Sequence, residues 1–409
     1  MKRLTVYVNQ KKIIQMSSNK SSSKVIFSSI GPSFSGLNNP GEDLETANLH
    51  ISSYPNSIKS WIEKGNSLKL LQRFSDSLDA FRQVPTLISK FPSSEELSLL
   101  ACAFYNIGNI ESSILKYSDY KKNYMKSIHF GIRSKHPLGL MFCSMGCFEL
   151  GLWYNQENNY KSSIHMHFRA AKIGNLSKTP EGLYISSRAY FNIANFEGRS
   201  ENYSNFKHLM EKSIEFGTNS KTISGLQTSI QAYQSLISWY QTKNETIQSG
   251  KYIQKVHDLE IDLFNTAETH KCIMEGQKFE DVGEIDKARI SYRKAIDLSR
   301  SLNNIIAKEL GTKATINLAQ VIRKNSKSTN LIEKSYTQII EFGEDTSTPW
   351  SLDQAAFAAL GLGSYLDQKG KSIKAVTYYN KAASLATKSG TNQGKRILGF
   401  ADSYKSMRN

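Results

Sequence analysis

The sequence is poor in the residues that mark several classes of protein. Its 409 residues include only four cysteines and eight prolines. Four cysteines give no disulfide framework in a chain of this length, which favours a reducing compartment. No apolar run approaches the roughly 18 residues that a membrane-spanning helix needs, and the first 20 residues lack the long apolar centre of a secretory signal. We therefore expect a folded, cytoplasmic protein.

Motifs of catalysis are missing as well. The sequence has no G-x-S-x-G, no G-x-x-x-x-G-K-[ST], no H-E-x-x-H and no C-x-x-C. Its one candidate metal site combines Cys143 and Cys147 with His165 and His167, since zinc takes four such nitrogen and sulfur ligands. However, histidines two positions apart on a helix point about 200° away from each other, and cysteine is a common small core residue. We expect no enzyme, no metal and no cofactor.

Positive charge is concentrated at the two ends of the chain. The net charge is +16, of which residues 1–41 carry +6 with no acidic residue and residues 367–409 carry +7. The long middle therefore carries only +3. A nucleic-acid-binding protein more often shows a basic stripe along its binding face, so the charge pattern favours solvated basic ends over a basic binding surface.

The first 41 residues differ in composition from the rest. They are rich in Ser, Lys, Asn and Gly, as in SSNKSSSK at 17–24. Such a segment cannot bury enough apolar surface to offset its ordering entropy. We predict a basic, Ser-rich disordered tail over 1–41. An organelle transit peptide is the alternative, because these are also basic, serine-rich and poor in acids.

From Glu42 onward the pattern is helical and repeated. Apolar residues recur at i, i+3, i+4 and i+7, and turn residues follow every 15 to 20 positions. Two segments, GEIDKARISYRKA from Gly283 and GKSIKAVTYYNKA from Gly370, share Gly, Ala, Tyr and Ala at the same four places, 87 residues apart. Each reads as a helix, a glycine turn and a second helix, with small residues where two helices approach closely.

These places resemble the tetratricopeptide repeat family, whose units carry small, large, glycine, small, aromatic and small residues in a fixed order. Weaker copies begin near Trp61, Ala101, Gly151 and Ala194, and two poor copies lie near Tyr240 and Ala319. In the second copy we take Ala101, Phe104, Gly108, Ser113 and Tyr117 as the pattern residues. The period is near 43, longer than the about 34 residues of the short units.

The resemblance implies an all-α, right-handed α-α superhelix of about eight helical hairpins over 42–393. We expect a capping helix over 394–409. One hairpin cannot bury its apolar face alone, but stacked hairpins make a continuous core. The pattern residues are therefore expected to build the solenoid and to contact no ligand.

In this family the inner, concave face belongs to the first helix of each hairpin. Carried over, that face is polar, rich in amides and somewhat basic, so it can bond a peptide backbone and pair with acidic side chains. The candidate residues of this peptide groove are Lys59, Asn66, Lys69, Tyr105, Asn106, Asn155, Arg188, Asn195, Arg199, Gln241, Gln277, Gln320 and Arg323.

One subgroup of the family clamps the C-terminal carboxylate of chaperones. Here Ile62, Ser98 and Leu99 stand where its polar clamp residues would be, so we do not predict that activity. The first hypothesis is a non-enzymatic protein-binding scaffold or adaptor, with self-association possible. The second is an RNA- or membrane-associated assembly factor acting through the basic ends. The third is a repeat protein that regulates an enzyme, which the sequence cannot separate from the first.

Overall fold

The computed structural model describes residues 40–114, 120–302, 304–326 and 328–406 of the chain. Over these ranges it contains 17 helices and no strand. The helices are α2 (Pro40–Ser53), α3 (Ile58–Leu70), α4 (Phe74–Leu87), α5 (Ser94–Ile114), α6 (Tyr120–Ser134), α7 (Pro137–Gln156), α8 (Tyr160–Ser177), α9 (Pro180–Arg199), α10 (Tyr203–Ser220), α11 (Ile223–Thr242), α12 (Thr246–Asp281), α13 (Ile285–Arg300), α14 (Ile305–Asn325), α15 (Thr329–Thr346), α16 (Pro349–Gln368), α17 (Ser372–Ser389) and α18 (Asn392–Ser406).

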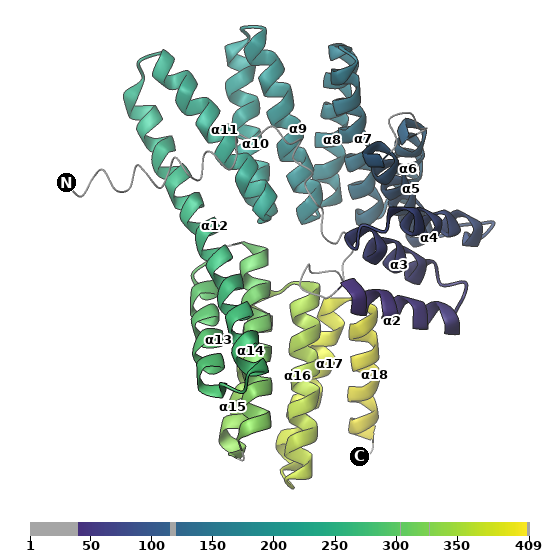
Figure 1. Cartoon of the computed structure of the whole chain (residues 1–409), viewed down its shortest axis with the longest axis vertical. Coiled ribbons are helices and arrows are strands. Elements are labelled where there is room, and N and C mark those ends of the chain that lie inside the picture. The colour runs from purple at the N-terminus through teal and green to yellow at the C-terminus, as the bar shows by residue number, and fades with distance from the viewer. Residues whose placement is uncertain (1–39, 115–119, 303, 327, 407–409) are drawn as a thin grey trace.

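Successive helices pack as antiparallel hairpins, and each hairpin packs on the next (Figure 1). The prediction of an all-α, right-handed superhelix of about eight hairpins is confirmed. The predicted tail falls almost wholly on residues 1–39, which lie outside the described ranges. None of the helices in those ranges is long and apolar enough to span a membrane.

A glycine on the first helix and a ring on the second hold most hairpins together. A Cβ placed on Gly65 would lie 2.8 Å from Phe81, and one on Gly276 or Gly363 would lie 2.6 Å from the ring of Tyr292 or Tyr379. Contacts this short do not occur between real atoms, so only glycine allows these helices to pack so closely. The same 16-residue separation joins Gly151 to His167, so a histidine replaces the aromatic ring there.

The register predicted for the second hairpin was wrong by seven residues. Gly108 packs against Tyr124, not Ala101 against Tyr117, and Tyr117 lies outside the described residues. Helix α5 is 21 residues long, so it contains two small residues that fit the pattern. Seven residues are nearly two helical turns, so the error left the predicted inward face of α5 almost unchanged.

The turns between hairpins repeat even more strictly than the core. Lys135, Lys178 and Lys221 are 43 residues apart and have left-handed φ of 51°, 56° and 53°. Each lies inside the pattern Gly-x-x-Ser-Lys-[His/Thr]-x-x-Gly. The two glycines bring the end of one hairpin against the start of the next: a Cβ on Gly174 would lie 2.3 Å from the carbonyl oxygen of Gly182.

Helix α12 is twice the usual length because the next turn pattern is absent. The positions that correspond to Gly217, Ser220 and Gly225 are Glu260, Leu263 and Glu268, 43 residues later. None of these favours a left-handed turn, so the helix continues for 36 residues. One helix thus closes the fifth hairpin and opens the sixth.

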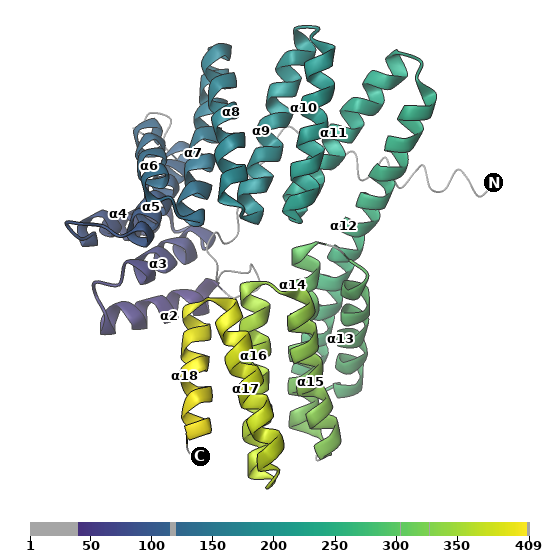
Figure 2. The same ribbon diagram turned by 180° about the vertical axis from the view of Figure 1, so that it is seen from behind.

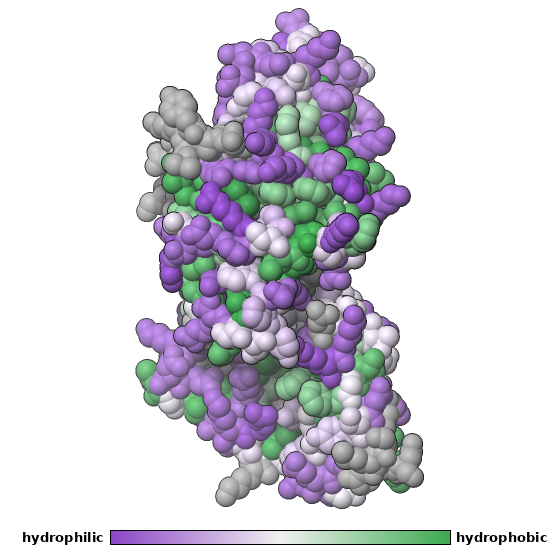
Figure 3. All heavy atoms as spheres, turned by 90° about the vertical axis from the view of Figure 1, so that its right-hand side faces the viewer, coloured by the Kyte–Doolittle hydropathy of each residue, from purple (hydrophilic) through white to green (hydrophobic). Residues whose placement is uncertain are grey.

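The superhelix is consequently divided into two halves. We call α2–α11 the N-terminal half and α13–α18 the C-terminal half, and α12 runs along both (Figure 2). The halves also meet at their turns, where the amide of Ile305 donates to the carbonyl of Lys221 at 3.0 Å. Asn304 beside it caps α14 and donates to Thr266 of α12 at 2.7 Å. The surface is hollowed between the two halves on the face shown in Figure 3.

Candidate functional site

A group of polar side chains lies on four first helices of the N-terminal half. It spans α3, α5, α7 and α9, which pack side by side. We call it the α3–α9 polar cluster; it comprises Asn66, Lys69, Tyr105, Asn106, Glu149, Tyr184 and Arg188.

Lys69 and Asn106 join the first two hairpins. The Lys69 Nζ atom donates to Oδ1 of Asn106 at 2.8 Å. The Asn106 amide donates in turn to the carbonyl of Cys102 at 3.1 Å. Burial lowers the pKa of Lys69 to about 8, although Cys102 and Glu149 oppose this shift. Lys69 is therefore a cation at neutral pH that lacks a full hydration shell.

Glu149 and Arg188 carry the charge of the next two hairpins. Burial raises the pKa of Glu149, and the nearby cations Arg188 and Lys69 partly offset the rise. Arg188 donates from Nη1 to the hydroxyl of Tyr184 at 3.0 Å, and its guanidinium lies 4.9 Å from the ring centre of Phe148. Within the described ranges Glu149 forms no salt bridge. Its carboxylate is thus attracted by two cations but fixed by neither.

Two donors in the cluster are buried without an acceptor. They are Nδ2 of Asn66 and the hydroxyl of Tyr105, for which the described residues supply no hydrogen bond. Leaving a buried donor unsatisfied costs roughly 1–3 kcal/mol. The cluster also has two cations, Lys69 and Arg188, against one carboxylate. This arrangement can hold an additional acceptor or anion, but it presents no nucleophile beside a general base.

The four residues considered as zinc ligands, and not predicted to bind metal, do not come together in the described structure. Cys143, Cys147 and His167 are buried, whereas His165 is exposed. Across the part of the chain that the structure covers, no three His, Cys, Asp or Glu residues gather as metal ligands. Burial and the Arg188 charge lower the pKa of His167 to about 4, and its Nε2 lies 3.4 Å from the Asn192 amide. His167 is therefore a neutral core ring at neutral pH.

Five of the predicted groove residues lie in the cluster: Asn66, Lys69, Tyr105, Asn106 and Arg188. The others lie elsewhere on the helices. Lys59 is near the start of α3; Asn155, Asn195, Arg199 and Gln241 are near the C-terminal ends of α7, α9 and α11; Gln277 is in α12, and Gln320 and Arg323 are in α14.

Sequence reasoning missed Glu149 and Tyr184. The 43-residue period would have revealed Glu149, because Glu63, Asn106, Glu149 and Asn192 occupy the same place in four successive hairpins. The error of register in the second hairpin hid this series. Tyr184 lies in the N-terminal extension of α9, for which the shorter family pattern has no place.

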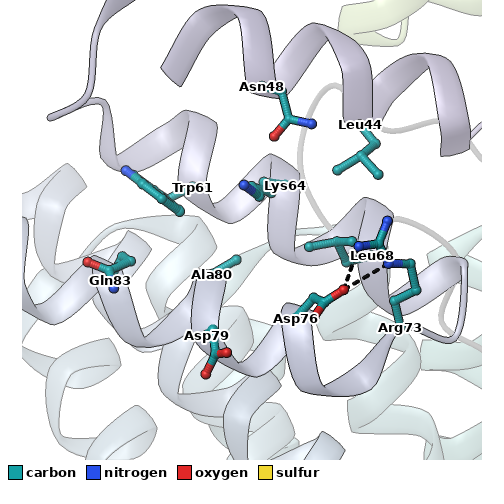
Figure 4. A pocket seen from close by; sticks show the side chains of 10 residues that line it. All are labelled: Leu44, Asn48, Trp61, Lys64, Leu68, Arg73, Asp76, Asp79, Ala80 and Gln83. Atoms are coloured by element: carbon teal, nitrogen blue, oxygen red, sulfur yellow. Dashed lines mark hydrogen bonds and ion pairs between the residues drawn. The ribbon is translucent and has the colours of Figure 1, made fainter. Parts of the chain in front are cut away.

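A cavity of about 400 Å³ lies among α2, α3 and α4 (Figure 4). Its strongest polar groups already bind one another: Arg73 pairs with Asp76 at 2.6 Å. Trp61 donates from Nε1 to the carbonyl of Pro55 at 2.8 Å, and Lys64 lies 5.2 Å from the Trp61 ring centre. A second hollow of about 470 Å³ lies along α13. We regard the α3–α9 polar cluster as the better candidate, because it contains donors that lack acceptors.

Comparison with known protein families identifies the type of repeat. Residues 358–389 match the family described as tetratricopeptide repeat. The chain carries a tetratricopeptide repeat. This confirms the family resemblance, and the matched segment contains the Gly363–Tyr379 contact described above. Repeats of this kind are typical of protein-interaction scaffolds. No curated protein matches the sequence.

Several solved structures are similar in outline. Yeast Tom70 is 11% identical over 90% of this chain and 86% of its own, with a TM-score of 0.25. The S. pombe nuclear import adaptor Nro1 is 11% identical over 76% of this chain and 100% of its own, with a TM-score of 0.32. The human IFIT1 dimer with m7Gppp-AAAA is 12% identical over 84% of this chain and 77% of its own, with a TM-score of 0.32. Sequence identities and TM-scores this low support no inference about a partner of this chain.

Proposed function

We propose that this protein is a non-enzymatic scaffold that binds a peptide segment of a partner protein at the α3–α9 polar cluster. The observation that carries the proposal is the pair of buried donors on Asn66 and Tyr105, next to the cations Lys69 and Arg188. A peptide would supply carbonyl acceptors to the donors and an acidic side chain to the cations. The segment would be extended or helical and would contain at least one acid.

The remaining predicted groove residues would extend this surface. Asn155, Asn195 and Arg199 lie further along the same helices, so a longer peptide could continue onto them. Binding at Gln241, Gln277, Gln320 and Arg323 would require a ligand that also reaches α11, α12 and α14. A cytoplasmic location and self-association remain predictions.

The alternative function, RNA or membrane association through the basic ends, is weakened by ion pairs near the C-terminus. Lys371 binds Glu333 at 2.7 Å and Lys381 binds Glu344 at 2.6 Å. These two lysines are therefore neutralised in part, which reduces the excess of positive charge in the C-terminal region.

The test is affinity capture from extract of the source organism, with the full chain and with residues 42–409, each at low and high salt and with and without nuclease. The proposal expects one discrete protein to be retained under all these conditions. Electrostatic binding to nucleic acid or anionic lipid weakens steeply as salt rises. Capture that disappears with salt or nuclease, or that requires residues 1–41, would support the alternative instead.

A further inference from the structure

The geometry points to Glu149 as an internal counter-ion of Lys69 and Arg188. Its ionised carboxylate occupies the place of the ligand's anionic group and therefore weakens the binding of acidic ligands. The inference rests on the proposed function, because it concerns the same α3–α9 polar cluster. The anionic group of the ligand is a carboxylate or a phosphate, since both offer several acceptor oxygens to cations and neutral donors.

The position of Glu149 supports this role. The residue is half-buried on α7, which packs between α5 and α9, and it occupies the place that Asn106, the partner of Lys69, has in the previous hairpin. It experiences the charge of both Lys69 and Arg188. No described residue bonds its carboxylate within salt-bridge distance, whereas Lys69 and Arg188 each donate to a neutral partner, Asn106 and Tyr184. An incoming anion can therefore take the same two cations without first breaking a direct ion pair. It must, however, approach an existing negative charge.

The unsatisfied donors show that Glu149 fills the cluster only in part. The Tyr105 hydroxyl is buried close enough to Glu149 to experience its charge, yet it has no acceptor. Asn66 likewise retains an unsatisfied Nδ2 atom. A ligand anion would satisfy donors that Glu149 does not reach, and this gain would offset part of the repulsion from its carboxylate.

The charges of the groups near Glu149 also affect an incoming anion, so their protonation states between pH 5 and 8 have to be known. The groups that interact with its charge are Lys69 from α3, Tyr105 from α5, Tyr124 from α6, and Tyr184 and Arg188 from α9. Cys102 of α5 interacts with Lys69, and His167 of α8 interacts with Arg188. Burial raises the pKa of the tyrosines and of Cys102, and it lowers the pKa of His167 to about 4, so these groups are neutral between pH 5 and 8. Arginine side chains in general are cations over this range.

Two groups then control anion binding over this range. Protonation of Glu149, whose pKa is raised by burial, removes the competing charge as the pH falls. Deprotonation of Lys69 above pH about 8 removes one of the cations. An acidic ligand should therefore bind more tightly as the pH falls, first because Lys69 takes up its proton near pH 8 and then because Glu149 becomes protonated.

The experiment measures sulfate binding to the full chain by calorimetry at constant ionic strength, because sulfate keeps the same charge between pH 5 and 8. We expect wild type to bind sulfate at least about fivefold more tightly at pH 5.5 than at pH 7.5, the size of a modest coupling between sites. Glu149→Gln should bind at pH 7.5 at least about fivefold more tightly than wild type and should lose most of the pH dependence.

Matched variants assign the effect to the cluster. Glu157→Gln, an exposed carboxylate just after α7, should behave as wild type. Lys69→Met should weaken sulfate binding in both the wild-type and the Glu149→Gln backgrounds, whereas Lys161→Met on the exposed face of α8 should not. Glutarate and phenyl phosphate, used in parallel, show whether the cluster prefers a carboxylate or a phosphate source.

The inference is wrong if sulfate does not bind, if Glu149→Gln leaves its affinity unchanged or lower, or if Lys69→Met has no effect. If Glu149→Gln does not fold, the pH dependence of sulfate affinity is compared between wild type and Lys69→Met. The role of Glu149 is excluded if both proteins show the same pH dependence and neither binds sulfate more tightly at low pH. The assay contains no peptide. Sulfate effects without partner capture would refute the scaffold proposal, and capture without sulfate effects would refute only this inference.

Discussion

The N-terminal and C-terminal halves of the superhelix use the same hairpin but join hairpins differently. In the N-terminal half the turns at Lys135, Lys178 and Lys221 recur every 43 residues, with glycines on both sides. At Glu260–Glu268 the core pattern continues but the turn pattern is absent, and α12 continues straight through. The core residues therefore decide that helices pair, whereas the turns decide whether one hairpin folds back on the previous one.

The two halves also differ in the polar groups that they bury. In the C-terminal half Thr391 donates to Asp353, at 2.7 and 2.8 Å from its two carboxylate oxygens, and Asn304 bonds Thr266 at 2.7 Å. The N-terminal half buries Asn66 and Tyr105 donors that have no acceptor among the described residues. On α13 the Nε atom of Arg289 is also buried without an acceptor among the described residues. The cations Lys69 and Arg188 beside the unsatisfied donors, and not the donors alone, therefore favour the N-terminal half as the candidate site.

The largest effect is expected from a charge placed in either core. Ala170 and Ala295 are both fully buried, so Ala170→Arg or Ala295→Arg should each cost about 4 kcal/mol of unfolding free energy. If the halves are separate cooperative units, hydrogen exchange should increase only in the half that carries the substitution. Equal loss of protection in both halves would show that the division at α12 has no energetic meaning, and unchanged thermal unfolding would refute the repeat assignment.

The turn glycines provide a second comparison. Gly174→Val should destabilise the protein by about 3 kcal/mol, because the side chain would collide with the backbone of Gly182. Gly250 lies inside α12 with nothing within 4 Å of its Cβ position, so Gly250→Ala should stabilise by about 0.5–1 kcal/mol. Urea unfolding measures both changes. A tolerated valine at 174 would contradict the role given to the turn.

Acid should weaken the N-terminal half first. The pKa of His167 is lowered to about 4, so the unfolded chain takes up a proton below pH 6.5 that the folded chain does not bind. Stability is therefore lost as the pH falls from 6.5 to 4, by about 2 kcal/mol. His167→Phe should remove this loss while leaving unfolding at pH 7.5 little changed. The corresponding rings of the C-terminal half are the tyrosines Tyr292 and Tyr379, and a tyrosine side chain takes up no proton in acid. If His167→Phe loses as much stability as wild type between pH 6.5 and 4, groups other than His167 cause the loss.

A smaller effect of pH concerns Lys69. Because its pKa is lowered to about 8 in the fold, the unfolded chain holds the proton to higher pH, and stability rises as the pH increases from 8 to 10. We expect a gain of about 1–2 kcal/mol that Lys69→Met lacks. Arg323→Met in the C-terminal half should keep the gain. If the unfolding free energies of wild type and Lys69→Met change equally with pH, Lys69 is not buried as a cation.

Much of the fold could be predicted from the sequence because each core contact is local. Gly276 and Tyr292, or Gly363 and Tyr379, lie within one hairpin, so their spacing alone indicates the pairing. The length of α12 could not be predicted from these residues, since it depends on turn glycines that are absent at 260–268.

The candidate site was predictable in part. The positions of Asn66, Lys69 and Arg188 follow from the inward face of the first helices, and Tyr105 and Asn106 were found despite the wrong register, because seven residues return to almost the same face. Glu149 and Tyr184 were missed because their importance depends on contacts between hairpins. Those contacts depend on how the hairpins stack, which a pattern within one hairpin does not determine.

The central claim is that a partner protein binds the polar cluster of the N-terminal half. The most direct test is capture of that partner by two double variants, each of which removes two cations: Lys69→Met with Arg188→Met, and Lys334→Met with Lys374→Met, two exposed lysines of the C-terminal half. Circular dichroism is used to check that both variants fold. We predict that the first variant loses the partner at least tenfold and that the second retains it. Loss in the second variant with retention in the first would contradict the account.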